Sequence, residues 1–389
     1  MTTPSRIKAI QPFHVMALLA RAKELEAEGK DIVHMEVGEP DFPTPAPIIA
    51  AGVKAISKGN VHYTPATGLP ELRQAVADHY QSRFNITVAA NRIVITPGAS
   101  GALMLALGAT INEGDEVILA DPGYPCNRNF VRFLSGKLRS VAVDASSSYQ
   151  LTLEHLQKNW QANTKAVIVA SPSNPTGTLL AQTELIKMAQ FVKEKDACLI
   201  VDEIYNGLVY EGDISTALAI DAGLDVAENI IVINSFSKYF NMTGWRVGWV
   251  VASESIVSDM DKLAQNIFLA APTPAQFAAL AAFKPETIAI LESHKAEFKQ
   301  RRDYLLPELK KLGFKIEVEP HGAFYIYANC EKFTQDSYQF AYDLLEKIGV
   351  AITPGKDFGD NKENTFVRFA YTTSIEHLKE GVKRLNDFL

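Results

Sequence analysis

The chain has 389 residues, and its 47 % hydrophobic and 21 % charged residues are typical of a globular enzyme. This length exceeds what one hydrophobic core comfortably serves and predicts two domains. A formal net charge of −7 disfavours a surface that binds polyanions, so we expect no nucleic-acid partner.

The N-terminus and the apolar segments predict no membrane span and a cytoplasmic location. The first fifteen residues, MTTPSRIKAIQPFHV, contain no apolar core of signal-peptide length. Residues 101–111 are too short to cross a bilayer, and prolines and polar residues interrupt the stretch 268–283. Cys126, Cys198 and Cys330 lie far apart without a CxxC pair, which fits a reducing compartment and predicts neither a disulfide framework nor a metal site.

Short apolar runs rich in β-branched residues alternate with helix-like segments. The runs are residues 92–96 (RIVIT), 116–120 (EVILA), 166–170 (AVIVA), 198–202 (CLIVD) and 230–233 (IIVI). Continuous apolar runs are typical of strands that are buried on both faces. Helical spacing between them, as in residues 100–110 and 183–196, predicts an α/β fold with a mostly parallel, doubly wound sheet. A further run at residues 247–252 predicts an edge strand.

The two ends of the chain have a different pattern. Residues up to about Pro47 are rich in proline, which predicts an extended segment followed by a helix. An α+β pattern begins beyond about Pro274. It comprises a charged helix at residues 286–312, strands at 314–318 and 323–327, and a final helix from Ser374. We therefore predict a large domain over residues 46–274 and a small domain built from residues 1–45 and 275–389.

Each of the five predicted strands is followed by a cluster of small and polar residues. The clusters are TPGAS, DPGYP, SPSNPTG, DEIY and NSFSK. In an open α/β sheet the carboxyl ends of the strands and the N-termini of helices meet at one edge, where ligands bind. The clusters therefore predict one site assembled from distant parts of the chain.

Residues 234–249, NSFSKYFNMTGWRVGW, give the strongest functional signal. Lys238 directly follows a buried strand, and Arg246 follows eight positions later. A lysine after a strand is most often a solvated surface residue, but small residues and two apolar strands surround this one. The other motifs, in chain order, are GEPDFPTP, YTPATGLPELR, TPGASGAL, DPGYP, SPSNPTG, DEIY and FVRFAYTTS. Over nearly its whole length the chain resembles the fold-type I pyridoxal-phosphate aminotransferases of class I/II.

This resemblance implies a fold with a large, mostly parallel sheet domain and a smaller α+β domain, and pyridoxal 5'-phosphate as the cofactor. Lys238 would form an aldimine with the cofactor, and amino groups would pass between an amino acid and a 2-oxo acid by a ping-pong mechanism. Asp202 would hold the proton on the pyridine nitrogen by its opposite charge. Asn174 and Tyr205 would hydrogen-bond the phenolic oxygen of the cofactor, and Tyr124 would stack on its ring.

The same resemblance implies a phosphate site. Gly98, Ala99 and Ser100 open a helix after a strand, where free N–H groups and the helix dipole favour an anion. Ser235 and Arg246 would supply further donors.

Tyr63 in YTPATG resembles a residue that reaches the phosphate from the other subunit, which implies a homodimer.

The substrate contacts implied by the resemblance are Arg368 and Asn174, which would bind the α-carboxylate, and the backbone of Gly38. Between residues 262 and 284 no Lys or Arg is present, unlike a subgroup that recognises a side-chain carboxylate there. Arg128 and Arg132 are alternatives for that contact. The aromatic segment HGAFYIY suits apolar or aromatic side chains as well as alanine, and the identity of the substrate stays open.

Two alternative functions also stay open. A carbon–sulfur β-lyase or another fold-type I enzyme would use the same cofactor, because a fold does not determine a reaction. A non-catalytic regulator is a remote alternative, since it would need a DNA-binding segment and no basic helix–turn–helix stretch precedes Pro40.

Overall fold

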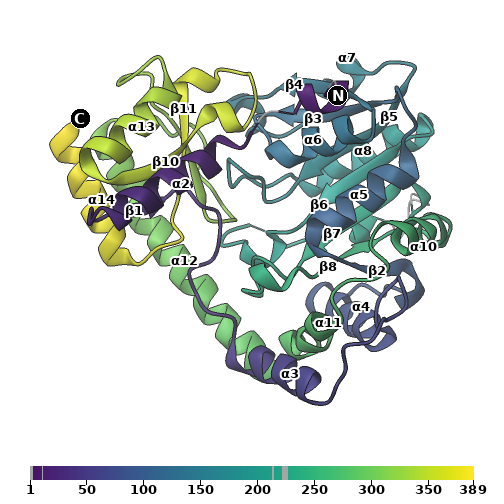
Figure 1. Cartoon of the computed structure of the whole chain (residues 1–389). Helices are drawn as coiled ribbons and strands as arrows, with labels where there is room; N and C mark the ends of the chain where they lie inside the picture. The colour runs from purple at the N-terminus through teal and green to yellow at the C-terminus, as the bar shows by residue number, and fades with distance from the viewer. Residues whose placement is uncertain (1–2, 11, 213, 221–226) are drawn as a thin grey trace.

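The computed structural model describes residues 3–10, 12–212, 214–220 and 227–389. The strands are β1 (Val33–Met35), β2 (Ile93–Thr96), β3 (Glu116–Asp121), β4 (Lys137–Ala142), β5 (Thr164–Ala170), β6 (Cys198–Asp202), β7 (Ile230–Ser235), β8 (Gly248–Val251), β9 (Tyr325–Asn329), β10 (Val350–Pro354) and β11 (Phe366–Ala370). They form a seven-stranded sheet of order β2-β8-β7-β6-β5-β3-β4 and a four-stranded sheet of order β1-β10-β11-β9. The two sheets occupy different halves of the molecule (Figure 1).

The described helices pack around these sheets. They are α1 (Ser5–Lys8), α2 (His14–Ala27), α3 (Ala46–Ser57), α4 (Pro70–Phe84), α5 (Gly98–Thr110), α6 (Pro125–Phe133), α7 (Leu153–Asn159), α8 (Gln182–Glu194), α10 (Glu254–Ile267), α11 (Thr273–Ala279), α12 (Pro285–Leu312), α13 (Ser337–Ile348) and α14 (Ile375–Phe388). The long helix α12 runs from the region of α3 and α11 to the half that holds the four-stranded sheet (Figure 1). In the part of the chain that the structure describes, no helix combines the length and the apolar character needed to cross a bilayer.

The predicted α/β fold is confirmed. All five apolar runs form strands of the large sheet, and β3, β5, β6 and β7 pair in parallel. Their side chains are almost entirely buried, as expected for strands covered on both faces. The helix predicted at residues 100–110 is α5, and the one predicted at 183–196 is α8.

One prediction about the margins of the large sheet is wrong, and one edge strand was not predicted. The run at residues 247–252 is not an edge strand, because β8 lies between β2 and β7 and is antiparallel to both. Its four residues are buried, which agrees with the continuous apolar run. The edge strands are β2 and β4. The sequence did not reveal β4, because its KLRSVA segment is polar and mostly half-buried or exposed.

The ends of the chain also differ from the prediction. The segment before Pro47 is not wholly extended, since α2 buries an apolar stripe of helical spacing at Val15, Leu18, Ala22 and Leu25. Residues 314–318 form no strand and make only one isolated bridge, from Lys315 to Asn329. The strand predicted at 323–327 begins two residues later, as β9.

The final helix begins as predicted. Ser374 is the N-cap of α14 and accepts a hydrogen bond from the N–H of His377. A serine at this position satisfies one of the N–H groups that the first turn of a helix leaves free.

Candidate active site

A cavity of about 210 Å³ lies between the carboxyl ends of the large-sheet strands and the four-stranded sheet. Most of the predicted site residues line it. They are Gly38, Ala99, Ser100, Tyr124, Asn174, Asp202, Tyr205, Lys238, Arg246 and Arg368. The predicted residues Gly98 and Ser235 lie behind this lining, and Tyr63 lies on the surface. The strand-end clusters therefore do converge on one place.

Lys238 projects into the cavity from the loop that follows β7. Its Nζ donates a hydrogen bond to the carbonyl oxygen of Gly38 at 2.6 Å. Burial lowers the pKa of Lys238 to about 8, and the positive charges of Arg368 and Arg246 act in the same direction. A larger share of the amine is thus unprotonated near neutral pH, which is the state that a nucleophilic lysine requires.

Asp202 ends β6 at the floor of the cavity. Its side chain is 5 % exposed, and its Oδ1 accepts the N–H of Ile204 at 3.0 Å. Burial raises the pKa of Asp202 to about 6, which the charge of Lys238 partly opposes. A buried carboxylate whose negative charge is only partly balanced by neighbouring groups is suited to bind a cationic group of a ligand.

Arg368 lies in the middle of β11, with 5 % of its surface exposed. Its Nη1 donates to Oδ1 of Asn174 at 2.9 Å, and its Nη2 donates to the carbonyl oxygen of Glu36 at 2.5 Å. The guanidinium carbon lies 4.2 Å from the ring centroid of Tyr325. Its buried Nε has no hydrogen-bond partner among the described residues, so the group retains donor capacity.

Tyr325 is a site residue that the sequence did not single out. Its hydroxyl lies 2.7 Å from that of Tyr205. It also lies so close to Gly38 that a Cβ at position 38 would be 1.9 Å from the hydroxyl oxygen, which explains the glycine there. The aromatic segment HGAFYIY was the available signal, but its pattern could not tell which ring faces the cavity.

The N-terminus of α5 forms a cradle for an anion. Gly98 has a φ of +70°, and a Cβ on it would lie 2.6 Å from Nη2 of Arg246. Ala99 and Ser100 follow in the first turn, where N–H groups are free of helical partners. A guanidinium that lies close to free N–H groups provides the positive charge and the hydrogen-bond donors that bind a phosphate.

Ser235 lies close to the cavity but does not line it. Its buried hydroxyl donates to Oγ of Ser237 at 3.0 Å and to the carbonyl oxygen of Val247 at 3.2 Å. Ser237 and Thr243 line the cavity in its place, and the sequence analysis assigned neither to the site.

The two arginines considered for a distal carboxylate do not line this cavity. Nη2 of Arg128 donates to the carbonyl oxygen of Asp357 at 2.7 Å, and Nη1 of Arg132 donates to Asn129 at 3.4 Å.

A group of apolar residues, which we call the outer wall, also lines the cavity. The sequence did not indicate it, because the N-terminal segment was expected to be extended rather than helical. Phe13, Val15 and Met16 at the start of α2 contribute to it, together with Phe358. Buried Asp357 holds this start in place, since its two oxygens accept the N–H groups of His14 and Val15 at 2.8 Å each.

The lining fits pyridoxal phosphate. A reactive amine at Lys238, an uncompensated carboxylate at Asp202 and the cradle of α5 with Arg246 correspond to the aldehyde, the ring nitrogen and the phosphate of that cofactor. Tyr124 stands at the N-terminus of α6 and presents an aromatic side chain to the same cavity.

Comparisons with known proteins agree with this site. The family model for aminotransferase class I and II matches residues 30–385. The chain is 41 % identical to a (5-formylfuran-3-yl)methyl phosphate transaminase of Methanocaldococcus jannaschii, over 99 % of this chain and 98 % of the relative. It is 37 % identical to a valine–pyruvate aminotransferase of Mycobacterium tuberculosis, over 98 % of this chain and 97 % of that relative.

Solved structures are similar throughout. An aminotransferase from Mycobacterium tuberculosis superimposes with a TM-score of 0.95 and 36 % identity, covering 100 % of this chain and 99 % of that one. The aspartate aminotransferase from Thermus thermophilus with maleate superimposes with a TM-score of 0.93 and 32 % identity, covering 100 % of both chains. These relatives favour an aminotransferase over the lyase and regulator alternatives. The chain belongs to the aminotransferase class I and II family, and it is a transferase of amino groups that depends on pyridoxal phosphate.

Proposed function

We propose that the enzyme prefers amino acids with apolar side chains and completes its active site only as a homodimer. The apolar outer wall carries the first part of this proposal. Among the described lining residues the basic side chains are Lys238, Arg246 and Arg368, and each has a role in holding the cofactor or the α-carboxylate. A side-chain carboxylate of the substrate would thus meet Phe13, Val15 and their apolar neighbours without a free cation. One relative is named a valine–pyruvate aminotransferase, whereas others are named aspartate aminotransferases.

Four residues would take part in the chemistry at the pyridine ring of the cofactor. The amine of Lys238 would hold the cofactor aldehyde and, once displaced by substrate, would carry a proton to and from the substrate Cα. Asp202 would keep the ring nitrogen protonated. Tyr205 and Asn174 would hydrogen-bond the phenolic oxygen. When bound, the cofactor withdraws electrons from the substrate Cα.

Orientation comes from the remaining groups. The N–H groups of Gly98, Ala99 and Ser100 together with Arg246 would bind the phosphate, with Ser235 close behind Ser237. The ring of Tyr124 would stack on the cofactor.

Arg368, Asn174 and the backbone of Gly38 would fix the substrate α-carboxylate, so that the reacting Cα–H bond is presented to Lys238 in one orientation.

The test is a panel of amino donors, measured by the change in visible absorbance when each reacts with the cofactor-loaded enzyme, and by the 2-oxo acid formed. We expect valine, leucine and phenylalanine to react at least about tenfold faster than aspartate and glutamate at equal low concentrations. Faster reaction of the acidic donors would overturn the proposed preference. Release of ammonia or a sulfur compound without a 2-oxo acid requirement would instead indicate the lyase.

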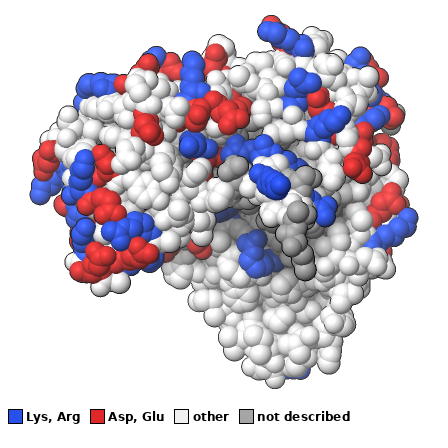
Figure 2. Space-filling model, turned by 45° about the horizontal axis from the view of Figure 1, so that its top comes forward, with Lys and Arg blue, Asp and Glu red and all other residues white. Residues whose placement is uncertain are grey.

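The homodimer is supported by an uncharged surface. Tyr63 is 83 % exposed, which is unusual for a tyrosine without a partner surface. On α3 the exposed residues Ile49, Val53 and Ile56 have helical spacing and share one face. The lower lobe in Figure 2, where Figure 1 places α3 and α11, shows almost no charged side chain. A second copy of the chain would bury this face and bring a Tyr63 to the neighbouring phosphate site.

Mixing two inactive variants tests this arrangement. If Tyr63 acts across the interface, a heterodimer of Tyr63→Phe and Lys238→Ala chains contains one site with both native residues. Activity should then rise above the mean of the two parents, toward about a quarter of the native value after random exchange of subunits. Activity equal to the parental mean, or a fully active monomer in sedimentation, would contradict the shared site.

Two further proposals concern organisation and location. The large sheet lies wholly within residues 46–274, and the small sheet draws strands from both chain ends, which supports the predicted division into two domains. Cys126, Cys198 and Cys330 are free thiols, which supports the proposal of a reducing, cytoplasmic location.

A further inference from the structure

Tyr325 occupies a position between the residues assigned to the cofactor and those assigned to the substrate. It is 1 % exposed, its hydroxyl is 2.7 Å from that of Tyr205, and its ring supports the guanidinium of Arg368. Two phenol hydroxyls at this distance share a single hydrogen bond, in which one donates and the other accepts. The direction of that bond decides whether the Tyr205 proton is free for another acceptor.

The backbone before Tyr325 is held in an unusual conformation. Ala323 has a φ of +58°, which is unfavourable for a residue with a Cβ. Its carbonyl oxygen accepts hydrogen bonds from the hydroxyls of Tyr210 and Tyr371, the latter at 3.3 Å. Its N–H donates to the carbonyl oxygen of Leu208 at 3.0 Å. Three partner atoms, two from residues 208–210 and one from Tyr371, thus fix the turn from which Tyr325 enters β9.

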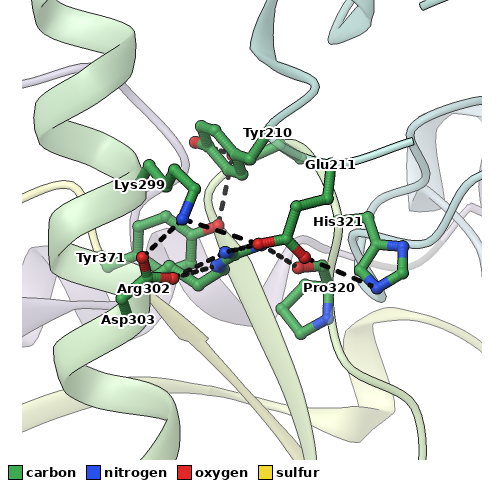
Figure 3. A network of polar contacts seen from close by, with 9 residues as sticks. Tyr210, Glu211, Lys299, Arg302, Asp303, Pro320, His321 and Tyr371 are labelled. Atoms are coloured by element: carbon green, nitrogen blue, oxygen red, sulfur yellow. Dashed lines mark hydrogen bonds and ion pairs between the residues drawn. The ribbon is translucent and has the colours of Figure 1, made fainter. Parts of the chain in front are cut away.

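Arg302 on α12 strengthens the same turn from the other side (Figure 3). Its Nη1 donates to the carbonyl oxygen of Pro320 at 2.9 Å, and its Nη2 donates to Glu211 at 2.7 Å. The guanidinium also lies 5.3 Å from the ring centroid of Tyr210. A buried arginine with this many partners keeps residues 320–323 and 210–211 together, and therefore limits where Tyr325 can point.

The charge of Arg368 indicates which phenol donates. Its guanidinium carbon is 4.2 Å from the ring of Tyr325, and Arg368 opposes the rise that burial causes in the pKa of Tyr325. Burial raises the pKa of Tyr205 well above its usual value, and Arg368 opposes that rise as well, but its guanidinium packs on the ring of Tyr325 and not on that of Tyr205. A cation packed on the ring of a phenol makes its hydroxyl the better donor, so this contact favours a bond from Tyr325 to the oxygen of Tyr205.

We propose that Tyr325 is a positioning residue that donates to Tyr205 and thereby directs the Tyr205 proton toward the phenolic oxygen of the cofactor. This inference rests on the proposed role of Tyr205. A phenol that accepts one hydrogen bond also becomes a stronger donor in the next one, so the effect on the cofactor extends beyond orientation.

The experiment is a spectrophotometric pH titration of the cofactor-loaded enzyme, whose visible absorbance changes when the cofactor attached to Lys238 gains a proton. A donor on the phenolic oxygen stabilises the unprotonated form and lowers the midpoint. We expect Tyr205→Phe to raise the midpoint by about one pH unit and Tyr325→Phe to raise it by about half a unit. The double variant should match Tyr205→Phe alone, because Tyr325 acts through Tyr205.

Two control variants separate this role from packing. Tyr149→Phe removes a half-buried hydroxyl that bonds Glu317 and should leave the midpoint unchanged. Tyr210→Phe removes one bond to Ala323, keeps the Tyr325 hydroxyl, and should shift the midpoint in the same direction by less. In Tyr325→Phe the ring remains under Arg368, so KM for the amino donor should stay within about twofold while kcat falls about threefold to tenfold.

The outcomes distinguish this inference from the proposed function on which it rests. An unchanged midpoint in Tyr205→Phe would refute the assigned role of Tyr205 itself. A shift in Tyr205→Phe together with an unchanged midpoint in Tyr325→Phe would overturn only the role of Tyr325. Additive shifts in the double variant would also overturn it, because they would mean that the two phenols act independently. If Tyr325→Phe fails to retain cofactor, the Tyr210→Phe titration decides in its place, and no shift there rejects the proposal.

Discussion

The two sheets contribute to the active site in different ways. In the large sheet, β6 ends in Asp202 and β7 leads directly to Lys238, so the reactive groups stand at or just beyond the ends of parallel strands. In the small sheet, Arg368 lies inside β11 and Tyr325 inside β9. These two strands are antiparallel with Ala370 opposite Tyr325, which places Arg368 and Tyr325 diagonally on one face.

This difference shows what each wall depends on. A strand-end residue is placed by the common edge of a parallel sheet and tolerates small shifts of the strand. A mid-strand residue is placed by the register of its pairing, and a slip of one residue would turn Arg368 to the opposite face. We call Asp202 and Lys238 the large-sheet wall of the cavity, and Arg368 and Tyr325 the small-sheet wall. The following variants test whether the large-sheet wall performs the chemistry while the small-sheet wall orients the substrate.

The largest effect should come from the large-sheet wall. Lys238→Ala removes the amine that holds the cofactor and moves the proton, and we expect turnover to fall by about 10⁴-fold or more. Borohydride should fix the cofactor to Lys238 in the native enzyme but not in the variant, as measured by peptide mapping. Lys262→Ala, at an exposed lysine paired with Asp259, is the matched control and should be fully active. Labelling of a different lysine in the native protein would refute the assignment.

On the small-sheet wall, Arg368→Lys keeps the charge but removes the planar pair of donors. We expect kcat/KM for the amino donor to fall about 100-fold, since a point charge cannot reproduce the two-point contact or the bond to Asn174. Borohydride labelling of Lys238 should persist, which separates orientation from cofactor attachment. Arg139→Lys, at a partly exposed arginine that pairs with buried Glu116 away from the cavity, provides the control. A loss of cofactor in Arg368→Lys would show that the walls are not separate.

The pH dependence of the free energy of unfolding tests the electrostatic environment of Asp202. Burial raises its pKa from 3.8 to about 6, so between these values the folded cofactor-free protein binds a proton that the unfolded chain has lost. The free energy of unfolding should therefore fall as pH rises from about 4 to 6, by about 2 kcal/mol relative to Asp202→Asn. Urea unfolding of both proteins over this range measures the difference. A difference that is independent of pH would contradict the raised pKa.

The same substitution should also reduce turnover strongly in the loaded enzyme, because an amide cannot keep the ring nitrogen charged. Near-native rates of the first half-reaction in Asp202→Asn would contradict this role.

The smallest effect is expected at the outer rim. Asp357→Ala frees the N–H groups of His14 and Val15, which should loosen the start of α2 and the apolar wall. We expect KM for large apolar donors to rise a few-fold, with little change for alanine. Asp336→Ala is the matched control, because Asp336 caps α13 through the N–H groups of Tyr338 and Gln339 away from the cavity. Equal KM changes in both variants would assign the effect to general loss of stability.

Local sequence patterns predicted five strands of the large sheet and the polar clusters that follow them. Continuous apolar runs indicated the strands, and the turn-rich clusters after them contain Asp202, Asn174 and Lys238, because local patterns record strand ends and helix starts. The roles of these three residues were implied by the resemblance to a family. Arg368 was also identified, through the FVRFAY motif and its resemblance to a family. Its position beside Tyr325 was not, since that depends on the pairing of β11 with β9.

Other parts of the structure depend on contacts between segments that are distant in sequence. The interior place of β8 follows from pairing with β2 and β7, although chain order suggested an edge. The strained turn at Ala323 is held because Tyr210 and Tyr371, which lie far apart in the chain, both donate to one carbonyl. No local pattern contains such a contact, because the free energy that holds it arises only when the separate segments are packed together.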